Sequence, residues 1–104
     1  MDGIEQGEIL SVERISTPVL AVSKKFFNRT EQIIACPVLK NASSDPLHIL
    51  IRTKEMQGVV LCEQVRILDL HVRGYKKIDE LRPEDIMNVA DAIQSIFDYY
   101  PFGK

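Results

Sequence analysis

The sequence lacks the features that mark several specialised classes of protein. It has no tryptophan, two cysteines, five glycines and five prolines among 104 residues, which excludes a cysteine-rich scaffold and a glycine-rich or proline-rich disordered chain. No apolar run approaches the roughly 18 residues of a membrane span. The chain opens with acidic residues, Asp2 and Glu5, where a secretory signal would carry basic ones. We therefore expect a globular, cytoplasmic protein that does not bind a membrane.

Excess positive charge is also missing. The 13 basic residues are outnumbered by 15 acidic ones, for a net charge of −2, so any binding of nucleic acid must be local. Eight of the basic residues fall into three short groups: Lys24, Lys25 and Arg29; Arg52 and Lys54; Arg73, Lys76 and Lys77. These groups could converge into one phosphate-binding surface, or each could be a solvated turn.

The chain does contain a series of short apolar runs separated by turn signals. Alternation of apolar and polar residues in such runs is typical of half-buried strands. The pattern predicts five or six strands, over residues 7–12, 18–22, 32–39, 47–53 and 59–70, the last as one bent strand or two joined ones. Pro37 has no N–H to donate, so the third strand should have an edge or a bulge at that point. Residues 24–29 are predicted to form a loop or a single helical turn.

From Pro83 onward the apolar period changes from two residues to about 3.6. Apolar residues recur at spacings of three and four, at Ile86, Val89, Ala90, Ile93, Ile96 and Phe97. This spacing predicts an amphipathic helix over about residues 83–99, with Pro83 at its first position. Short strands followed by one helix predict an α+β, mainly β fold. We expect a single domain over residues 1–104, a small antiparallel barrel with a C-terminal amphipathic helix.

Motifs for metals and cofactors are absent. His48, His71, Cys36 and Cys62 do not have the spacing of a metal site, and no glycine-rich phosphate loop is present. Both cysteines lie in apolar runs, where they should behave as small hydrophobic residues. We predict neither a metal nor a cofactor.

The block at residues 58–69 places polar side chains inside an apolar run. Such groups cost free energy unless they are hydrogen-bonded or used in function. Glu63, Gln64, Arg66 and Asp69 are therefore a candidate site. Arg66 and Asp69 are three residues apart and would point to opposite faces of a regular strand. We expect these two residues and Gln64 to shape the barrel around Glu63.

Acid and base chemistry without a metal could use part of this block. Cleaving RNA in that way needs a base for the 2′-hydroxyl, a cation for the phosphate and a proton donor for the leaving oxygen. Glu63, flanked by apolar residues, could be the base and Arg73 the cation. The alternative is that Glu63 only pairs with a nearby arginine or lysine and stabilises the barrel.

Several segments together resemble one known family. They are Gly-Glu-Ile at residues 7–9, Pro-Val-Leu-Ala-Val-Ser at 18–23 and Gly-Val-Val-Leu-Cys-Glu-Gln-Val-Arg-Ile-Leu-Asp at 58–69, followed by Arg73 and the helix. Over almost its whole length the chain resembles the MazF/PemK family of bacterial toxins. The resemblance implies a small SH3-like barrel with a terminal helix and a homodimer. It also implies cleavage of single-stranded RNA without a metal until a cognate antitoxin blocks the groove.

Two residues match functional positions of that family. Glu63 corresponds to the acidic residue before the family's glutamine, which is assigned as the base in some members. Arg73 corresponds to the basic residue downstream, which acts on the phosphate or as the acid. We therefore predict that Glu63 and Arg73 are catalytic. The predicted RNA contacts are Thr17, Ser23, Lys24, Lys25, Arg29, Lys76 and Lys77.

The chain departs from the family pattern at several positions, among them Leu61, where some members carry a basic residue two before the acid, and the shortened loop at residues 13–16. Thr17 stands where an arginine usually precedes the proline of the second strand, and Leu39 or Lys40 stands where a threonine or serine usually ends the third. Losing a transition-state cation costs about 100-fold or more in rate. Two functions therefore stay open: a toxin-like endoribonuclease, and a catalytically degenerate or protein-binding homologue that acts through protein contacts, as CcdB-like toxins do. A third reading is a structural or regulatory dimer without toxicity.

Overall fold

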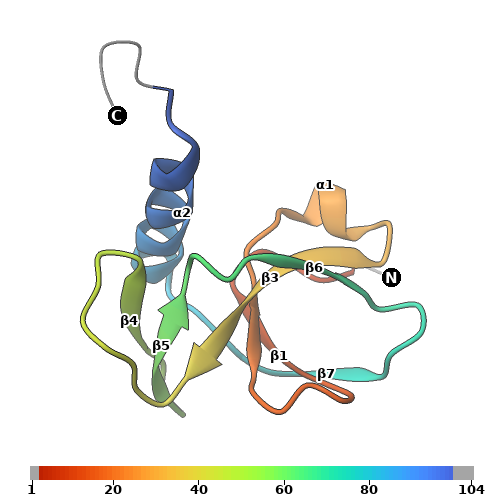
Figure 1. The fold of residues 1–104 in the computed structure, drawn as a ribbon. Coiled ribbons are helices and arrows are strands. Elements are labelled where there is room, and N and C mark those ends of the chain that lie inside the picture. The colour runs from red at the N-terminus through yellow and green to blue at the C-terminus, as the bar shows by residue number, and fades with distance from the viewer. Residues whose placement is uncertain (1–2, 100–104) are drawn as a thin grey trace.

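The computed structural model describes residues 3–99, and within them the chain forms seven strands and two helices (Figure 1). The strands are β1 (Glu8–Val12), β2 (Val19–Ala21), β3 (Gln32–Leu39), β4 (His48–Arg52), β5 (Gln57–Leu61), β6 (Arg66–Asp69) and β7 (Tyr75–Glu80). A single helical turn, α1 (Lys25–Asn28), lies between β2 and β3, and the C-terminal helix is α2 (Pro83–Phe97). The predicted mainly β fold with a C-terminal amphipathic helix is confirmed.

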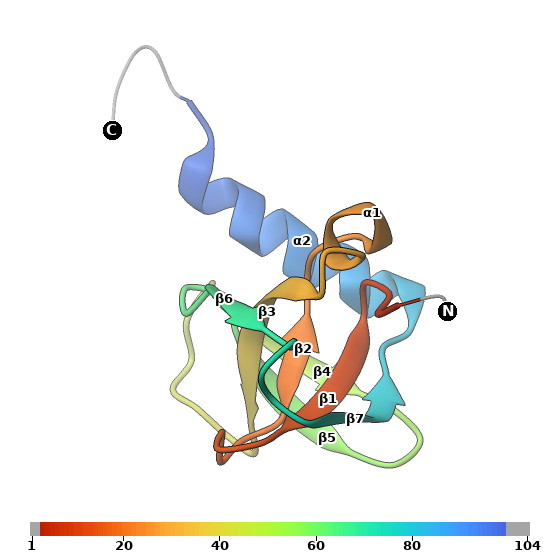
Figure 2. The same cartoon turned by 90° about the vertical axis from the view of Figure 1, so that its right-hand side faces the viewer.

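The strands form one antiparallel sheet in the order β4-β5-β3-β2-β1-β7, with β6 also paired to β3. The long strand β3 is the centre of this arrangement. One of its edges pairs with β2, and its other edge pairs first with β6 and then with β5. The sheet is bent into a barrel-like shape, with α2 on the side of β4 and β5 (Figures 1 and 2).

Pro37 lies at the point where β3 changes partners. On that edge Ala35 is the last residue paired with β6 and Val38 is the first paired with β5. Val38 donates its N–H to the Pro18 carbonyl oxygen on the opposite, β2 side. Because donors alternate along a strand, the Pro37 nitrogen faces the gap between β6 and β5, where no ladder bond is lost. The predicted interruption at Pro37 is therefore present.

Two apolar clusters fill the two sides of the central strands. Leu10, Val19, Ala21 and Ile33 belong to the first cluster, together with Leu68 of β6. The second cluster is formed by β1, β2 and β3 with β4, β5 and α2; its fully buried members include Ile9, Leu20, Cys36, Val60 and Cys62. Apolar residues therefore face both ways from β1, β2 and β3, which is why these strands read as nearly continuous apolar runs.

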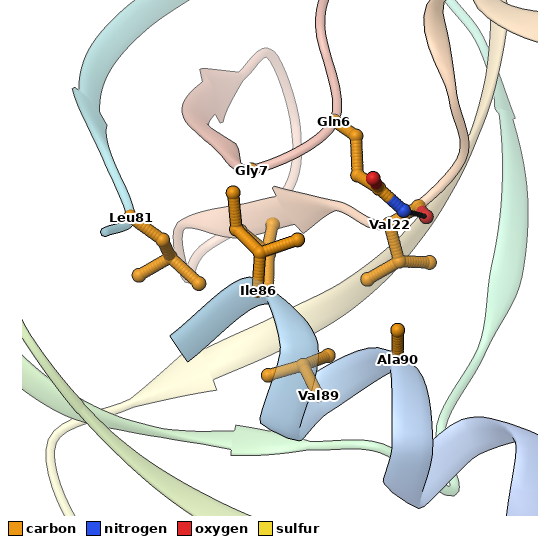
Figure 3. Close-up of a pocket in the computed structure, with 8 residues that line it drawn as sticks. Gln6, Gly7, Val22, Leu81, Ile86, Val89 and Ala90 are labelled. Atoms are coloured by element: carbon orange, nitrogen blue, oxygen red, sulfur yellow. Dashed lines mark hydrogen bonds between the residues drawn. The ribbon is translucent and has the colours of Figure 1, made fainter. Parts of the chain in front are cut away.

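The helix α2 packs on the sheet through a tight contact between Ile86 and Gly7 (Figure 3). Gly7 has a φ of +97°, and a Cβ there would collide with Cδ1 of Ile86 and lie 2.9 Å from its Cγ1. Gln6 lies beside it and donates from Nε2 to the Val22 carbonyl oxygen at 2.9 Å. Glycine is therefore required at position 7 for both the backbone and the close approach of the helix.

Three elements of the structure differ from the sequence expectations or decide between them. The helix ends at Phe97, two residues before the expected boundary. The run at 59–70 forms two strands, β5 and β6, joined by a turn at residues 62–65. Strand β7 was not expected, because five of its six residues are exposed and it has no apolar alternation. It pairs with β1 as an edge strand, so Lys76 and Lys77 lie in a strand instead of a turn.

Candidate active site

A surface cleft of about 500 Å³ opens where the β1–β2 loop, the end of β3 and the β5–β6 turn come together. Most of its lining is apolar: Ile15, Val19, Ala35, Cys36, Pro37, Leu39, Leu61 and Val65. Its polar side chains come from Ser16 and Thr17 on the loop, and from Gln64 and Arg66 on the other wall. An apolar cleft with a few convergent polar groups is the usual form of a binding site.

The predicted base, Glu63, belongs to the turn between β5 and β6. In this turn the N–H of Gln64 donates to the Leu61 carbonyl oxygen at 3.1 Å. The Glu63 side chain is 38% exposed. The sequence-based premise of a carboxylate enclosed by an apolar strand is therefore wrong, because the strand is interrupted there. Leu61 and Gln64, on either side of Glu63 in the chain, both line the cleft.

Glu63 has a partner that the sequence reasoning missed. His48 Nε2 lies 3.1 Å from Glu63 Oε2, and His48 Nδ1 donates to the Ser43 carbonyl oxygen at 2.7 Å. The bond to Ser43, and then the bond to Glu63, raise the pKa of His48 above its ordinary value. The pair depends on β4–β5 register, which places His48 opposite Leu61 and two residues from Glu63. Only that register would have revealed it.

Arg66 also lies in the candidate site, although its spacing from Asp69 had favoured a structural role. It begins β6, pairs with Ala35 of β3, and lines the cleft beside Gln64. Asp69 is at the far end of β6, opposite Gln32, and accepts the N–H of His71 at 2.9 Å. The polar block is therefore divided, with Gln64 and Arg66 at the cleft and Asp69 away from it.

Arg73, the second predicted catalytic residue, is not brought together with Glu63. It lies beyond the opposite end of β6, where its Nη1 donates to the Glu13 carbonyl oxygen at 3.3 Å. The Gly74 N–H also donates to Glu13 Oε1 at 2.9 Å. These bonds tie the β6–β7 loop to the start of the β1–β2 loop, whose later residues line the cleft. Arg73 itself does not line it.

Among the predicted RNA contacts, Thr17 lines the cleft and Ser23 does not. Ser23 is 9% exposed; its hydroxyl donates to Asn28 Oδ1 at 2.5 Å and accepts the Ile34 N–H at 2.9 Å. Asn28 Nδ2 in turn donates to the Ile4 carbonyl oxygen at 2.7 Å. Because its hydroxyl is engaged inside the protein, Ser23 holds α1 in place and has no exposed group to offer RNA.

The basic residues do not form one continuous surface. Lys24, Lys25 and Arg29 are exposed on or beside α1, whereas Lys76 and Lys77 lie on β7, well apart from α1 in both views (Figures 1 and 2). Two of these lysines, Lys25 and Lys77, form ion pairs within the chain. Lys25 Nζ is 3.8 Å from Glu5, and Lys77 Nζ is 2.6 Å from Glu80 and 3.7 Å from Glu8. The Glu80 hydrogen bond is the largest cause of the raised pKa of Lys77.

Within the described residues, neither the two cysteines nor a group of metal ligands adds a reactive site. Burial raises the pKa of Cys36 to about 12 and that of Cys62 to about 11, so both remain protonated thiols at neutral pH. Within residues 3–99, no three His, Cys, Asp or Glu side chains are grouped so that they could hold a metal ion. Neither α1 nor α2 has the length and apolarity to cross a bilayer.

Comparison with known proteins identifies the class to which this barrel and cleft belong. The family described as PemK-like, MazF-like toxins of type II toxin-antitoxin systems matches residues 7–97. The endoribonuclease toxin ChpB of Escherichia coli strain K12 is 30% identical over 88 residues, covering 74% of each chain. The chain therefore belongs to the PemK/MazF-like toxin family, as the sequence resemblance had indicated.

Solved structures share the fold. The MazE–MazF structure (Form-I) from Deinococcus radiodurans superposes with a TM-score of 0.83 at 23% identity, over 91% of this chain and 96% of that one. A mycobacterial endoribonuclease in complex with its cognate antitoxin gives a TM-score of 0.78 at 17% identity, over 94% and 99% of the two chains. These likenesses confirm the mainly β fold with its terminal helix.

Proposed function

We propose that the chain is an endoribonuclease that cuts single-stranded RNA without a metal, acts in the cytoplasm and is inhibited by a cognate antitoxin. The observation that carries this proposal is the cleft, where Gln64 and Arg66 face an apolar lining and the carboxylate of Glu63 lies in the adjoining turn. A family of toxins that includes an endoribonuclease relative supports the same activity.

The proposed roles follow from the chemistry of RNA cleavage. Arg66 binds the scissile phosphate and stabilises the charge that develops on it, which is the role of a preorganised cation. Glu63 accepts the proton of the 2′-hydroxyl as that oxygen attacks the phosphorus; the P–O5′ bond breaks to leave a 2′,3′-cyclic phosphate, and the leaving 5′-oxygen takes a proton from solvent. Gln64 positions the nucleotide by hydrogen bonding. Thr17, on the opposite wall, contacts the RNA backbone.

Arg66 supplies a basic side chain to a cleft that departs from the family pattern. The cleft has a threonine at position 17 and a leucine at position 39, where family members usually carry an arginine and a hydroxyl residue. Arg66 is the one basic side chain among the residues that line the cleft in the described part of the chain. Arg73 remains a predicted catalytic residue from the resemblance alone, because its contacts are to Glu13.

The activity is tested with purified protein and a mixed-sequence single-stranded RNA in excess EDTA. The wild type is expected to cut, whereas Glu63→Gln should lose about 100-fold or more in rate. Because Glu63 is exposed in a turn, this substitution leaves the apolar clusters intact. If the wild type cuts only after Mg²⁺ is added, the metal-independent mechanism is wrong. If Glu63→Gln cuts at the wild-type rate, the assignment of the base is wrong.

A second candidate function is protein binding by a catalytically degenerate barrel. Leu50, which projects from β4, is 73% exposed, and Leu39 occupies the position where a catalytic hydroxyl is usual. A protein of this kind would arrest growth while cellular RNA stayed intact. RNA profiles after induced expression of the wild type, with Glu63→Gln beside it, distinguish the two functions.

We further propose a homodimer, with the antitoxin as the second protein partner. Exposed apolar side chains on β4 and α2 support contacts of this kind: Leu50, Met87, Ile96 and Phe97. Light scattering over a range of concentrations should give twice the monomer mass. Co-expression with a small acidic protein encoded beside this gene should yield a complex that does not cut RNA. A monomer at every concentration would contradict the dimer.

A further inference from the structure

The contact between His48 and Glu63 has a defined protonation. The Ser43 carbonyl oxygen can only accept a hydrogen bond, so His48 Nδ1, at 2.7 Å, must carry a proton. An ionised carboxylate also only accepts, so Nε2, at 3.1 Å from Glu63 Oε2, must carry one as well. Both bonds are made together only by the imidazolium form of His48.

The charges around His48 favour this form. Glu63 faces the ring from the β5–β6 turn, and Asp45 adds negative charge from the loop before β4. Both raise the pKa of His48, although the hydrogen bond to the Ser43 carbonyl oxygen is the largest cause. Within residues 3–99, the charged groups that shift the pKa of His48 are both carboxylates, Glu63 and Asp45.

The two partners differ in exposure. The His48 side chain is 13% exposed, whereas that of Glu63 is 38% exposed. Glu63 Oε2 is held by His48, and Oε1 has no hydrogen-bond partner among the described residues. The carboxylate is therefore fixed through one oxygen and presents the other to solvent beside the cleft-lining Leu61 and Gln64.

We propose that His48, as an imidazolium bonded to Ser43 and Glu63, is a positioning residue that holds the β5–β6 turn and keeps the free oxygen of Glu63 oriented toward the RNA 2′-hydroxyl. The purpose given to this contact rests on the proposed endoribonuclease function. The contact itself does not. His48 touches neither the RNA nor the reacting atoms and acts only through Glu63.

This arrangement makes the orientation of Glu63 dependent on pH. When pH rises through the raised pKa of His48, Nε2 loses its proton and presents a lone pair to the carboxylate. The two groups then repel each other, and the turn loses its link to β4 and to the loop at Ser43. A glutamine at position 48 would keep an N–H donor for Glu63 at every pH.

The protonation is tested by NMR on the full chain labelled with ¹⁵N-histidine. His48 is expected to show two protonated ring nitrogens below its pKa, and that pKa should lie above the ordinary histidine value of about 6.5. Glu63→Gln should lower the pKa of His48, because it removes the carboxylate that helps to raise it. If the pKa of His48 does not lie above about 6.5, or does not change in Glu63→Gln, the positioning role is overturned.

The positioning role is tested by cleavage kinetics on single-stranded RNA. His48→Ala is expected to lower kcat by roughly 10-fold to 100-fold with little change in KM, because misorientation of a reacting group acts on the chemical step. His48→Gln should recover much of kcat and remove the fall in rate at high pH. His71→Gln is the matched control and should behave as the wild type. If His48→Ala keeps the wild-type kcat and pH profile, the proposal is wrong.

The two proposals fail in different ways. If His48 proves to be an imidazolium bonded to Glu63 but the protein cuts no RNA, both the endoribonuclease function and the role of His48 in it are overturned. If RNA is cut and Glu63→Gln is inactive, but His48 titrates independently of Glu63, only the positioning role is overturned.

Discussion

The two ends of strand β6 carry the same kinds of side chain in very different settings. Before β6, Glu63 pairs with a largely covered histidine, His48, next to an apolar cleft. After β6, Asp69 pairs with His71 at 3.3 Å, but both side chains are about half exposed and neither lines the cleft of the candidate site. A histidine–carboxylate pair is therefore present at both ends of β6. The lower exposure of His48 and the adjoining apolar cleft distinguish the pair before β6 as the candidate site.

The largest expected effect is a difference in RNA cleavage rate between variants of Arg66 and Arg73, the arginines at the two ends of β6. Arg66→Ala should lower the rate of RNA cleavage about 100-fold or more, because it removes the cation from the cleft. Arg73→Ala should cost less than about tenfold, because it loosens only the tie to Glu13. Single-turnover cleavage rates measure both. A larger loss for Arg73→Ala would move the catalytic cation to the far end of β6, as the family resemblance alone predicts.

Substitutions at two glycines compare the rigidity of two regions. Gly58 lies beside the cleft-lining Leu39, and Gly74 lies in the β6–β7 loop beside Glu13. A Cβ at Gly58 would lie 2.9 Å from both the Leu39 carbonyl oxygen and Val38 Cγ1, so β5 would have to move away from β3. Gly58→Ala should therefore destabilise the fold by about 2 kcal/mol. At Gly74 the Cβ would meet the flexible side chain of Glu13, with 2.8 Å to Oε2. Gly74→Ala should cost under about 1 kcal/mol.

Urea unfolding of the two variants, read at constant m-value, measures this difference. Equal losses of stability would show that the region beside the cleft is no more rigid than the β6–β7 loop.

The contribution of His48 to the free energy of unfolding should depend on pH. The pKa of His48 is raised in the folded state, so its contribution is fully present below the unfolded value of about 6.5 and disappears as pH rises through the folded pKa. The Tm of His48→Ala should therefore fall furthest below that of the wild type near about pH 6, and the difference should shrink in alkaline buffer. His71→Ala is the control. A difference in Tm that grows with pH would contradict the imidazolium contact.

The smallest effect concerns the lysines of β7, beyond the far end of β6. Lys77 is already paired with Glu8 and Glu80, whereas Lys76 has no ion pair among the described residues. Lys76→Ala should reduce the salt dependence of RNA binding by under about one unit of slope, and Lys77→Ala should change it less. Fluorescence anisotropy over a range of salt concentrations measures both. Equal reductions would show that the acidic partners do not screen Lys77.

The elements with a regular apolar period could be predicted from the sequence. Strand β3 has the expected bounds, and α2 begins at Pro83 as its period indicates. Strand β7 could not be predicted, because its residues are mostly exposed and only pairing with β1 defines it. An edge strand that buries little apolar surface leaves no periodic signal.

The candidate site was predictable only in part. The polar block suggested Glu63 and the family resemblance supported it, whereas Gln64 was expected to have only a structural role. The pairing of His48 with Glu63 depends on the β4–β5 register, and the position of Arg66 at the cleft depends on its pairing with Ala35. Register between strands distant in sequence is a tertiary property that one strand's alternation does not reveal.

The most direct test of the cleft as the RNA site is an NMR titration of the full ¹⁵N-labelled chain. The ligand is a single-stranded RNA with 2′-deoxy sugars, which binds but lacks the attacking hydroxyl. The largest shift changes are expected at Thr17, Gln64 and Arg66, and these changes should be lost in Arg66→Ala. Changes confined to α1 and β7, with Gln64 and Arg66 unmoved, would contradict it.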